Sequence, residues 1–291
     1  MIRIKMTRKL FLYLSFTTLI LTACDNTPLD IDCSSTNVNI QNYNMDSIFV
    51  NANVDELTIW NERFKNKIQD AYYYELGQCL RIKSADDSLI LNSVQTFIKD
   101  PYIQSIEKAI AVKHKNSSKY HTDIVEGMRH LKFHFPQMKI PKATVFVNSC
   151  FQSSAFCTEN EIVIGLERYL GKDEPLLKKL PSDVFYEWIK KGMEPQFLTR
   201  DAICGWILTQ FEQKEDANLA ESMVNWGKVL YSVEAAFPDE KKEIIVRYTA
   251  EELKWAEENE KAFWSYLINE KLLFVFNQRE KNNMLRPGPT T

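Results

Sequence analysis

All four histidines of the chain lie in one short stretch, at His114, His121, His130 and His134. His130 and His134 are four residues apart, so on a helix they share one face, a spacing that suits two zinc ligands. A zinc peptidase of the HExxH type needs a glutamate directly after the first of these histidines, as its general base. The chain has Leu131 there. We therefore interpret both as helix histidines beside an apolar stripe, and we predict no metal ligand and no cofactor.

No other motif supplies a catalytic group. The sequence lacks the GxSxG elbow of α/β-hydrolases and the GxGxxG and GxxxxGK[ST] loops that bind nucleotides. A Ser/His/Asp triad stays open, because its members meet only in the fold. The pair Asp173–Glu174 and the five glutamates between Glu251 and Glu260 are most simply solvated faces, although the second group could attract a basic partner. We predict a non-catalytic protein, and a zinc-peptidase-like hydrolase with an unrecognised active site is the alternative.

The N-terminus has the parts of a lipoprotein signal peptide. Basic residues precede the apolar run Leu10–Leu21, which is too short to span a bilayer because spanning takes about 20 residues. Leu21-Thr-Ala-Cys24 then forms a lipobox. We expect residues 1–23 to be removed and the Cys24 thiol to carry lipid that anchors the chain in the cell envelope, facing the periplasm or on the outer membrane. An ordinary secretory signal with a chance cysteine is the alternative.

Five cysteines remain besides Cys24. Because five is odd, at least one is a free thiol or pairs between chains. Cys150 and Cys157 flank a polar loop and are the best candidates for a disulfide, which an envelope location permits. Buried unpaired cysteines are the alternative.

The composition indicates one folded body behind a tether. Apolar residues make up 45% and aromatic residues 12% of the chain, enough for a substantial core. Removal of the four basic residues of the signal peptide lowers the formal net charge from −3 to −7. No basic stripe remains, so we expect no nucleic-acid partner. Residues 24–40 are polar and turn-rich and predict a flexible tether, followed by a globular domain over residues 41–291.

Helical periodicity dominates that domain, which we predict to be a mostly helical α+β fold with a small sheet. Apolar stripes at helical spacing begin at Leu57, Ile103 and Tyr120. Two short β-branched runs, residues 143–147 and 161–166, predict neighbouring strands. Further helices are expected from Ser182, from Thr199, over residues 218–236 and behind a capping box at Thr249.

From residue 133 onward the chain resembles the gliding-motility lipoprotein B family (GldB) of Bacteroidetes. The resembling stretches include Phe133-His-Phe-Pro136, Ile162-Val-Ile-Gly-Leu-Glu-Arg-Tyr-Leu-Gly171, Met223-Val-Asn-Trp-Gly-Lys-Val-Leu-Tyr231, Ala236-Phe-Pro-Asp239 and Trp255–Trp264. The resemblance implies an envelope lipoprotein linked to gliding motility and type IX secretion, with partners among the envelope proteins of that apparatus.

The family is similar to zincin-type zinc peptidases that have lost their metal helix, which implies a pseudoenzyme scaffold. The helix after Thr199 would occupy that position, with Asp201, Cys204 and Trp206 but no histidine. The family pattern continues past a Pro-x-Thr motif, whereas this sequence stops at Pro287-Gly-Pro-Thr-Thr291. We therefore expect a C-terminus that is truncated or unusually short.

The shared motifs contain two pairs of residues of the types that anchor interfaces. Arg168 and Tyr169 lie in one motif, and Lys228 and Tyr231 lie in the other. Gly227, in the middle of a predicted helix, indicates either close helix packing or a binding surface. We predict these four residues as a candidate interaction motif, with core packing as the alternative.

Overall fold

The computed structural model describes residues 28–82, 87–211, 214 and 216–285. The chain divides into two units, residues 1–31 and residues 32–291, and all the elements below belong to the second. The predicted signal peptide, Cys24 and the first residues of the predicted tether lie outside the described residues. Within the described ranges, no helix combines the length and the apolarity needed to cross a bilayer.

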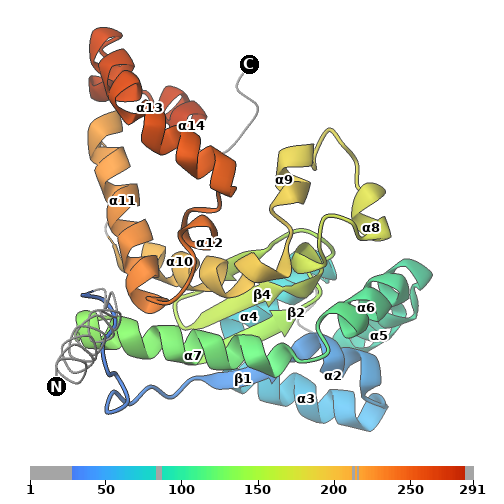
Figure 1. The fold of residues 1–291 in the computed structure, drawn as a ribbon. Coiled ribbons are helices and arrows are strands. Elements are labelled where there is room, and N and C mark those ends of the chain that lie inside the picture. The colour runs from blue at the N-terminus through green and yellow to red at the C-terminus, as the bar shows by residue number, and fades with distance from the viewer. Residues whose placement is uncertain (1–27, 83–86, 212–213, 215, 286–291) are drawn as a thin grey trace, which may run out of the picture. The chain divides into compact units, whose positions relative to one another are not determined.

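A four-stranded sheet lies at the centre of the second unit (Figure 1). Its strands, in spatial order, are β1 (Gln41–Asn44), β2 (Ala143–Val147), β4 (Glu161–Gly165) and β3 (Ala155–Cys157). The first three run parallel, and β3 pairs antiparallel with β4. Every residue of β2 and β4 is buried, which explains their continuous apolar runs. Both predicted strands are confirmed, and β1 was missed because its sequence is polar.

Helices cover both faces of the sheet (Figure 1). Alternate residues point to opposite faces, so Phe146 joins one core and Val145 the other. The first core is completed by α6 (Pro101–Lys113), α7 (Ser117–His134), α10 (Leu198–Gln210) and α11 (Leu219–Ala236). The second is completed by α2 (Met45–Asn51), α3 (Val54–Lys67), α4 (Gln69–Tyr74) and α5 (Asp87–Lys99). The fold is the predominantly helical α+β domain that the sequence predicted.

The other helical segments are shorter or belong to the C-terminal part. They are η1 (Glu75–Cys79), η2 (Leu166–Tyr169), α8 (Pro175–Lys178), α9 (Glu187–Lys191), η3 (Pro195–Phe197), α12 (Lys242–Val246), α13 (Ala250–Asn269), η4 (Leu272–Phe274) and α14 (Gln278–Leu285). The predicted capping box is confirmed at α13, where Thr249 and Glu252 each accept a hydrogen bond from the other's backbone.

The helix predicted from Ser182 is mostly absent. Turns occupy this stretch and only α9 is helical. Val184 is exposed, and Tyr186 stacks on Trp188 with ring centroids 6.4 Å apart. The apolar spacing therefore reflects Phe185 and Ile189, which pack against the first core, beside the exposed Val184 and Trp188.

Two further predictions need correction. Residues 33–40 do not form a loose tether, because Cys33, Val38 and Ile40 are buried. Cys150 and Cys157 are both free thiols, so the predicted disulfide does not form here. Cys157 pairs with the beginning of β4, whereas Cys150 follows β2 at the edge where β4 ends. The two thiols are therefore held toward opposite ends of the sheet.

Candidate functional site

The first pair of predicted interaction residues lies inside the fold. Tyr169, at the end of η2, is 1% exposed. Arg168 is half-buried, donates a hydrogen bond to the Phe151 carbonyl at 3.3 Å and lies over the Phe185 ring at 5.1 Å. Neither side chain is presented to a partner. For this motif the structure therefore supports the core-packing alternative.

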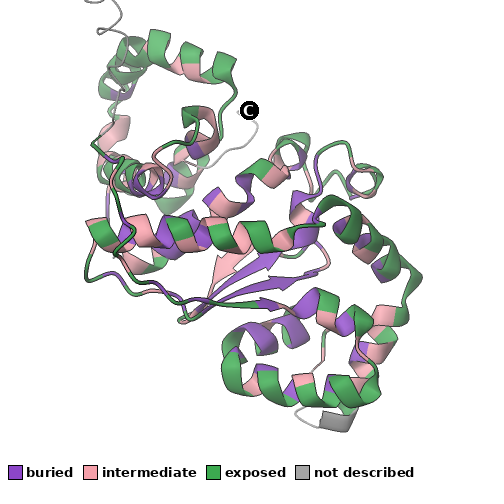
Figure 2. Cartoon of the chain, turned by 60° about the horizontal axis from the view of Figure 1, so that its bottom comes forward, coloured by how far each residue is buried: buried purple, intermediate pink, exposed green. Residues whose placement is uncertain are grey.

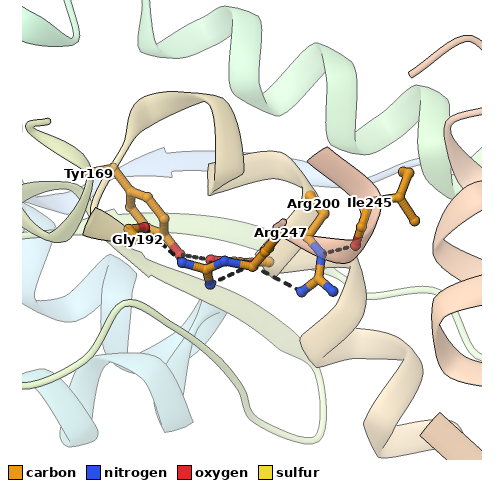
Figure 3. A network of polar contacts seen from close by, with 6 residues as sticks. Tyr169, Gly192, Arg200, Ile245 and Arg247 are labelled. Carbon is orange, nitrogen blue, oxygen red and sulfur yellow. Dashed lines mark hydrogen bonds and ion pairs between the residues drawn. The ribbon is translucent and has the colours of Figure 1, made fainter. Parts of the chain in front are cut away.

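Tyr169 leads to a network of charged residues around Asp201, at the start of α10 (Figure 3). The Tyr169 hydroxyl donates to Asp201 Oδ2 at 3.1 Å. Arg247 Nη1 donates to both carboxylate oxygens, at 3.1 and 2.9 Å, and Arg200 Nη1 donates to Oδ1 at 3.2 Å. The Asp201 side chain is only 11% exposed. This carboxylate therefore joins η2, α10 and the residue that ends α12.

Arg247 also ends α12 and links the same network to the residue after α9. Its φ of 60° is left-handed and ends α12. Its Nη2 donates to the Gly192 carbonyl at 2.8 Å (Figure 3). A Cβ at position 192 would lie 2.3 Å from that nitrogen, so this approach requires glycine. Nothing in the local sequence around Gly192 indicates this contact, because Arg247 lies 55 positions away.

The expected resemblance of the family to zinc peptidases would put their metal helix at the position of α10. All three residues that the sequence singled out there have partners or lie in the core. Asp201 faces two guanidinium groups, and the Trp206 indole donates to the Lys139 carbonyl at 2.8 Å. Cys204 is buried, and burial raises the pKa of its thiol. These three side chains thus stabilise the fold and do not line an open site.

Buried acids gather at the carboxyl ends of the parallel strands, where open α/β sheets bind ligands. Burial raises the pKa of Glu167 to about 7, although Ser149 and the Phe151 amide donate hydrogen bonds to it. Burial and the adjacent Glu107 also raise the pKa of Asp46. The cavity beside Asp46 and Glu107 measures about 10 Å³, room for about one water molecule. This edge is therefore a packed cluster of protonatable groups and not a ligand pocket.

The second pair of predicted interaction residues is at the surface. Lys228 is exposed on α11, and Tyr231 on the same helix is 58% exposed. A Cβ at Gly227 would meet no atom of the described residues within 4 Å, so close helix packing does not explain this glycine. The binding-surface interpretation of the motif stays a prediction.

The most unusual surface belongs to α13, whose residues are almost all exposed (Figure 2). Only Leu267 is buried in its twenty residues. The α13 aromatic set, by which we mean four exposed side chains on this helix, comprises Trp255, Phe263, Trp264 and Tyr266. The apolar spacing predicted a helix but gave no indication that its aromatic residues would be exposed.

One group in the described part of the chain has the geometry of a metal site. It consists of Cys33, Glu126 and His130, whose ligand atoms all lie within 4.8 Å of one another. His134, which the sequence paired with His130, is not part of it. Sequence reasoning missed this group because Cys33 is distant along the chain and lies in the predicted tether.

Comparisons with known proteins place the chain in a family. No curated protein and no solved structure matches it. Residues 26–291 match the family described as gliding motility protein GldB. This match covers nearly the whole chain and includes residues 26–132, which precede the resembling stretches. The chain therefore belongs to the gliding motility protein GldB family.

Proposed function

We propose that this protein is a non-catalytic lipoprotein of the cell envelope that acts by binding other envelope proteins. Membership of the gliding motility family supports a role in the gliding apparatus. The lipobox supports an anchor on Cys24. The resemblance links gliding to type IX secretion, and we propose that the contact with other envelope proteins serves that process. We place the globular domain on the periplasmic side or at the outer membrane.

The observation that carries this proposal is the exposure of α13. Trp255 is 64% exposed and Tyr266 is 56% exposed. A helix with large apolar residues on several sides is normally enclosed by other elements. Tryptophan and tyrosine are also the residue types that contribute most to interface free energy, often about 2 kcal/mol or more each. We infer that a partner protein covers α13.

The charges on α13 indicate the chemistry of that partner. Five glutamates lie in the first half of the helix on both sides of Trp255, and the other three aromatic residues follow them; the glutamates are Glu251, Glu252, Glu257, Glu258 and Glu260. Lys254 and Lys242 each pair with one of them through exposed contacts, which contribute little. The matching surface would offer apolar pockets with basic groups around them. Opposite charge at the edge of an interface speeds encounter and selects the partner.

The alternative is an envelope hydrolase of zinc-peptidase type. The engagement of Asp201 by two arginines argues against it, because a metal ligand or general base needs a free lone pair. Deletion of the gene distinguishes the two functions. Loss of a contact protein should impair motility or secretion without the accumulation of an uncleaved substrate. If an uncleaved substrate accumulates, and the purified protein then cleaves that substrate, the protein is a hydrolase.

Substitutions on α13 test the contact directly. We expect Trp255→Ser with Tyr266→Ser to lower partner co-purification and motility at least tenfold. The melting temperature should change by no more than about 2 °C, because both side chains are already hydrated. Ile59→Ser on α3, where the side chain is 68% exposed, is the matched control. If stability and function fall together, α13 is part of the core and the proposal fails.

A further inference from the structure

Cys33, Glu126 and His130 meet although they come from distant parts of the chain. Glu126 and His130 are four residues apart on α7, so they share a helix face. Cys33 precedes β1 in a segment that the burial of Val38 and Ile40 fixes against the first core. The Cys33 thiol donates to Glu126 Oε1 at 3.4 Å, and His130 Nε2 lies 3.9 Å from the same oxygen.

We propose that these three side chains bind a zinc ion that fastens the segment before β1 to α7. Their ligand atoms lie within 4.8 Å of one another. A tetrahedral zinc site, with metal–ligand bonds of about 2.0–2.3 Å, separates its ligand atoms by about 3.5 Å. Side-chain movements of about 1 Å would therefore close the site. Thiolate and imidazole favour zinc, whereas magnesium and calcium prefer oxygen ligands.

The surroundings orient the ligands for this role. Arg129 donates to Glu126 Oε2 at 2.8 Å, which leaves Oε1 facing Cys33 and His130. Such outer contacts are typical of metal-binding carboxylates. His130 Nδ1 is buried without a hydrogen-bond partner in the described structure, and the 3.9 Å contact of Nε2 is too long for a hydrogen bond. A metal at Nε2 would give this ring nitrogen a partner, whereas Nδ1 would stay buried without one.

The Cys33 thiol donates its proton to Glu126 Oε1. Zinc binding would replace that proton on Sγ and release it to solvent. The Glu126 side chain is 50% exposed, so water can complete the coordination.

Metal binding by the full-length lipidated protein, purified in detergent without a histidine tag, tests the proposal. We expect about one zinc ion per chain after dialysis. Cobalt should bind with the ultraviolet charge-transfer absorption of a thiolate–cobalt bond. Cys33→Ser, Glu126→Gln and His130→Ala should each weaken binding at least tenfold, and zinc should protect Cys33 from alkylation. His134→Ala, on the same helix, should leave binding unchanged.

Glu126→Gln keeps the test decisive if Cys33→Ser fails to fold, because Glu126 is half exposed and the change keeps its shape. Zinc should also raise the melting temperature of the unmodified protein and not that of Glu126→Gln. Absence of zinc and cobalt binding by the unmodified protein would overturn the proposal. Binding that survives all three ligand substitutions would also overturn it, because the metal would then lie elsewhere.

Discussion

Replacement of Asp201 by asparagine removes one negative charge from the α10 network and keeps the shape of the side chain. Two guanidinium groups then face each other around a neutral amide. Loss of one partner of a buried ion pair typically costs about 3–5 kcal/mol. The Arg247 side chain is 34% exposed and can be rehydrated, so we expect about 2–3 kcal/mol, at or just below the lower end of that range. For a domain of this size, that lowers the melting temperature by about 5–10 °C.

Urea denaturation and thermal melting, followed by circular dichroism, measure this effect. Glu257→Gln is the control, because its contact with Lys242 at 3.5 Å joins two exposed side chains and should contribute less than about 0.5 kcal/mol. Tyr169→Phe tests the network, since the losses from Tyr169 and Asp201 should not add if both act through one contact. Equal stability of Asp201→Asn and Glu257→Gln would refute this account of the network.

Three further predictions concern the buried Glu167, the lipid anchor on Cys24 and the exposed Tyr231. The pKa of Glu167 is raised from 4.5 to about 7. The contribution of protonated Glu167 to the stability of the fold is therefore fully present below pH 4.5 and is lost as the pH rises through 7. Glu167→Gln should remove this loss, at most about 3 kcal/mol, when urea midpoints at pH 5 and pH 8 are compared. Cys24→Ala should release a soluble or uncleaved form, and a cleaved form that stays in the membrane fraction would contradict the anchor. Tyr231→Ser should weaken partner retention with a melting temperature within about 2 °C of the unmodified protein, whereas equal losses would indicate packing.

Local signals in the sequence predicted many of the elements. Asp100 directly precedes Pro101 and caps α6, because its side chain accepts hydrogen bonds from the Tyr102 and Ile103 amides at 2.8 and 3.2 Å. The apolar stripe predicted to begin at Leu57 continues through Phe64 and Ile68, which are fully buried. These features depend on a few neighbouring residues, so sequence reasoning reaches them. The polar strand β1 is defined by pairing with β2, and such long-range pairing leaves no local signal.

The candidate sites were less predictable, because they depend on which side chains are buried by neighbouring elements and which stay exposed. Tyr169 and Tyr231 are the same residue type in similar motifs, yet one is 1% and the other 58% exposed. Periodicity gives the face on which a residue lies and not what packs against that face. The Asp201 network joins residues more than forty positions apart, and Cys33 reaches α7 over a still longer separation. Only the fold brings these groups together.

Photo-cross-linking in living cells tests the central claim, contact through α13, most directly. A photoreactive amino acid would replace Trp255 or Tyr266 in turn, and Ile59 on α3 as the exposed control. We predict a discrete cross-linked product with another envelope protein from both α13 positions and none from position 59. Absence of a product from α13, or the same products from all three positions, would contradict the claim that this helix is the partner-binding surface.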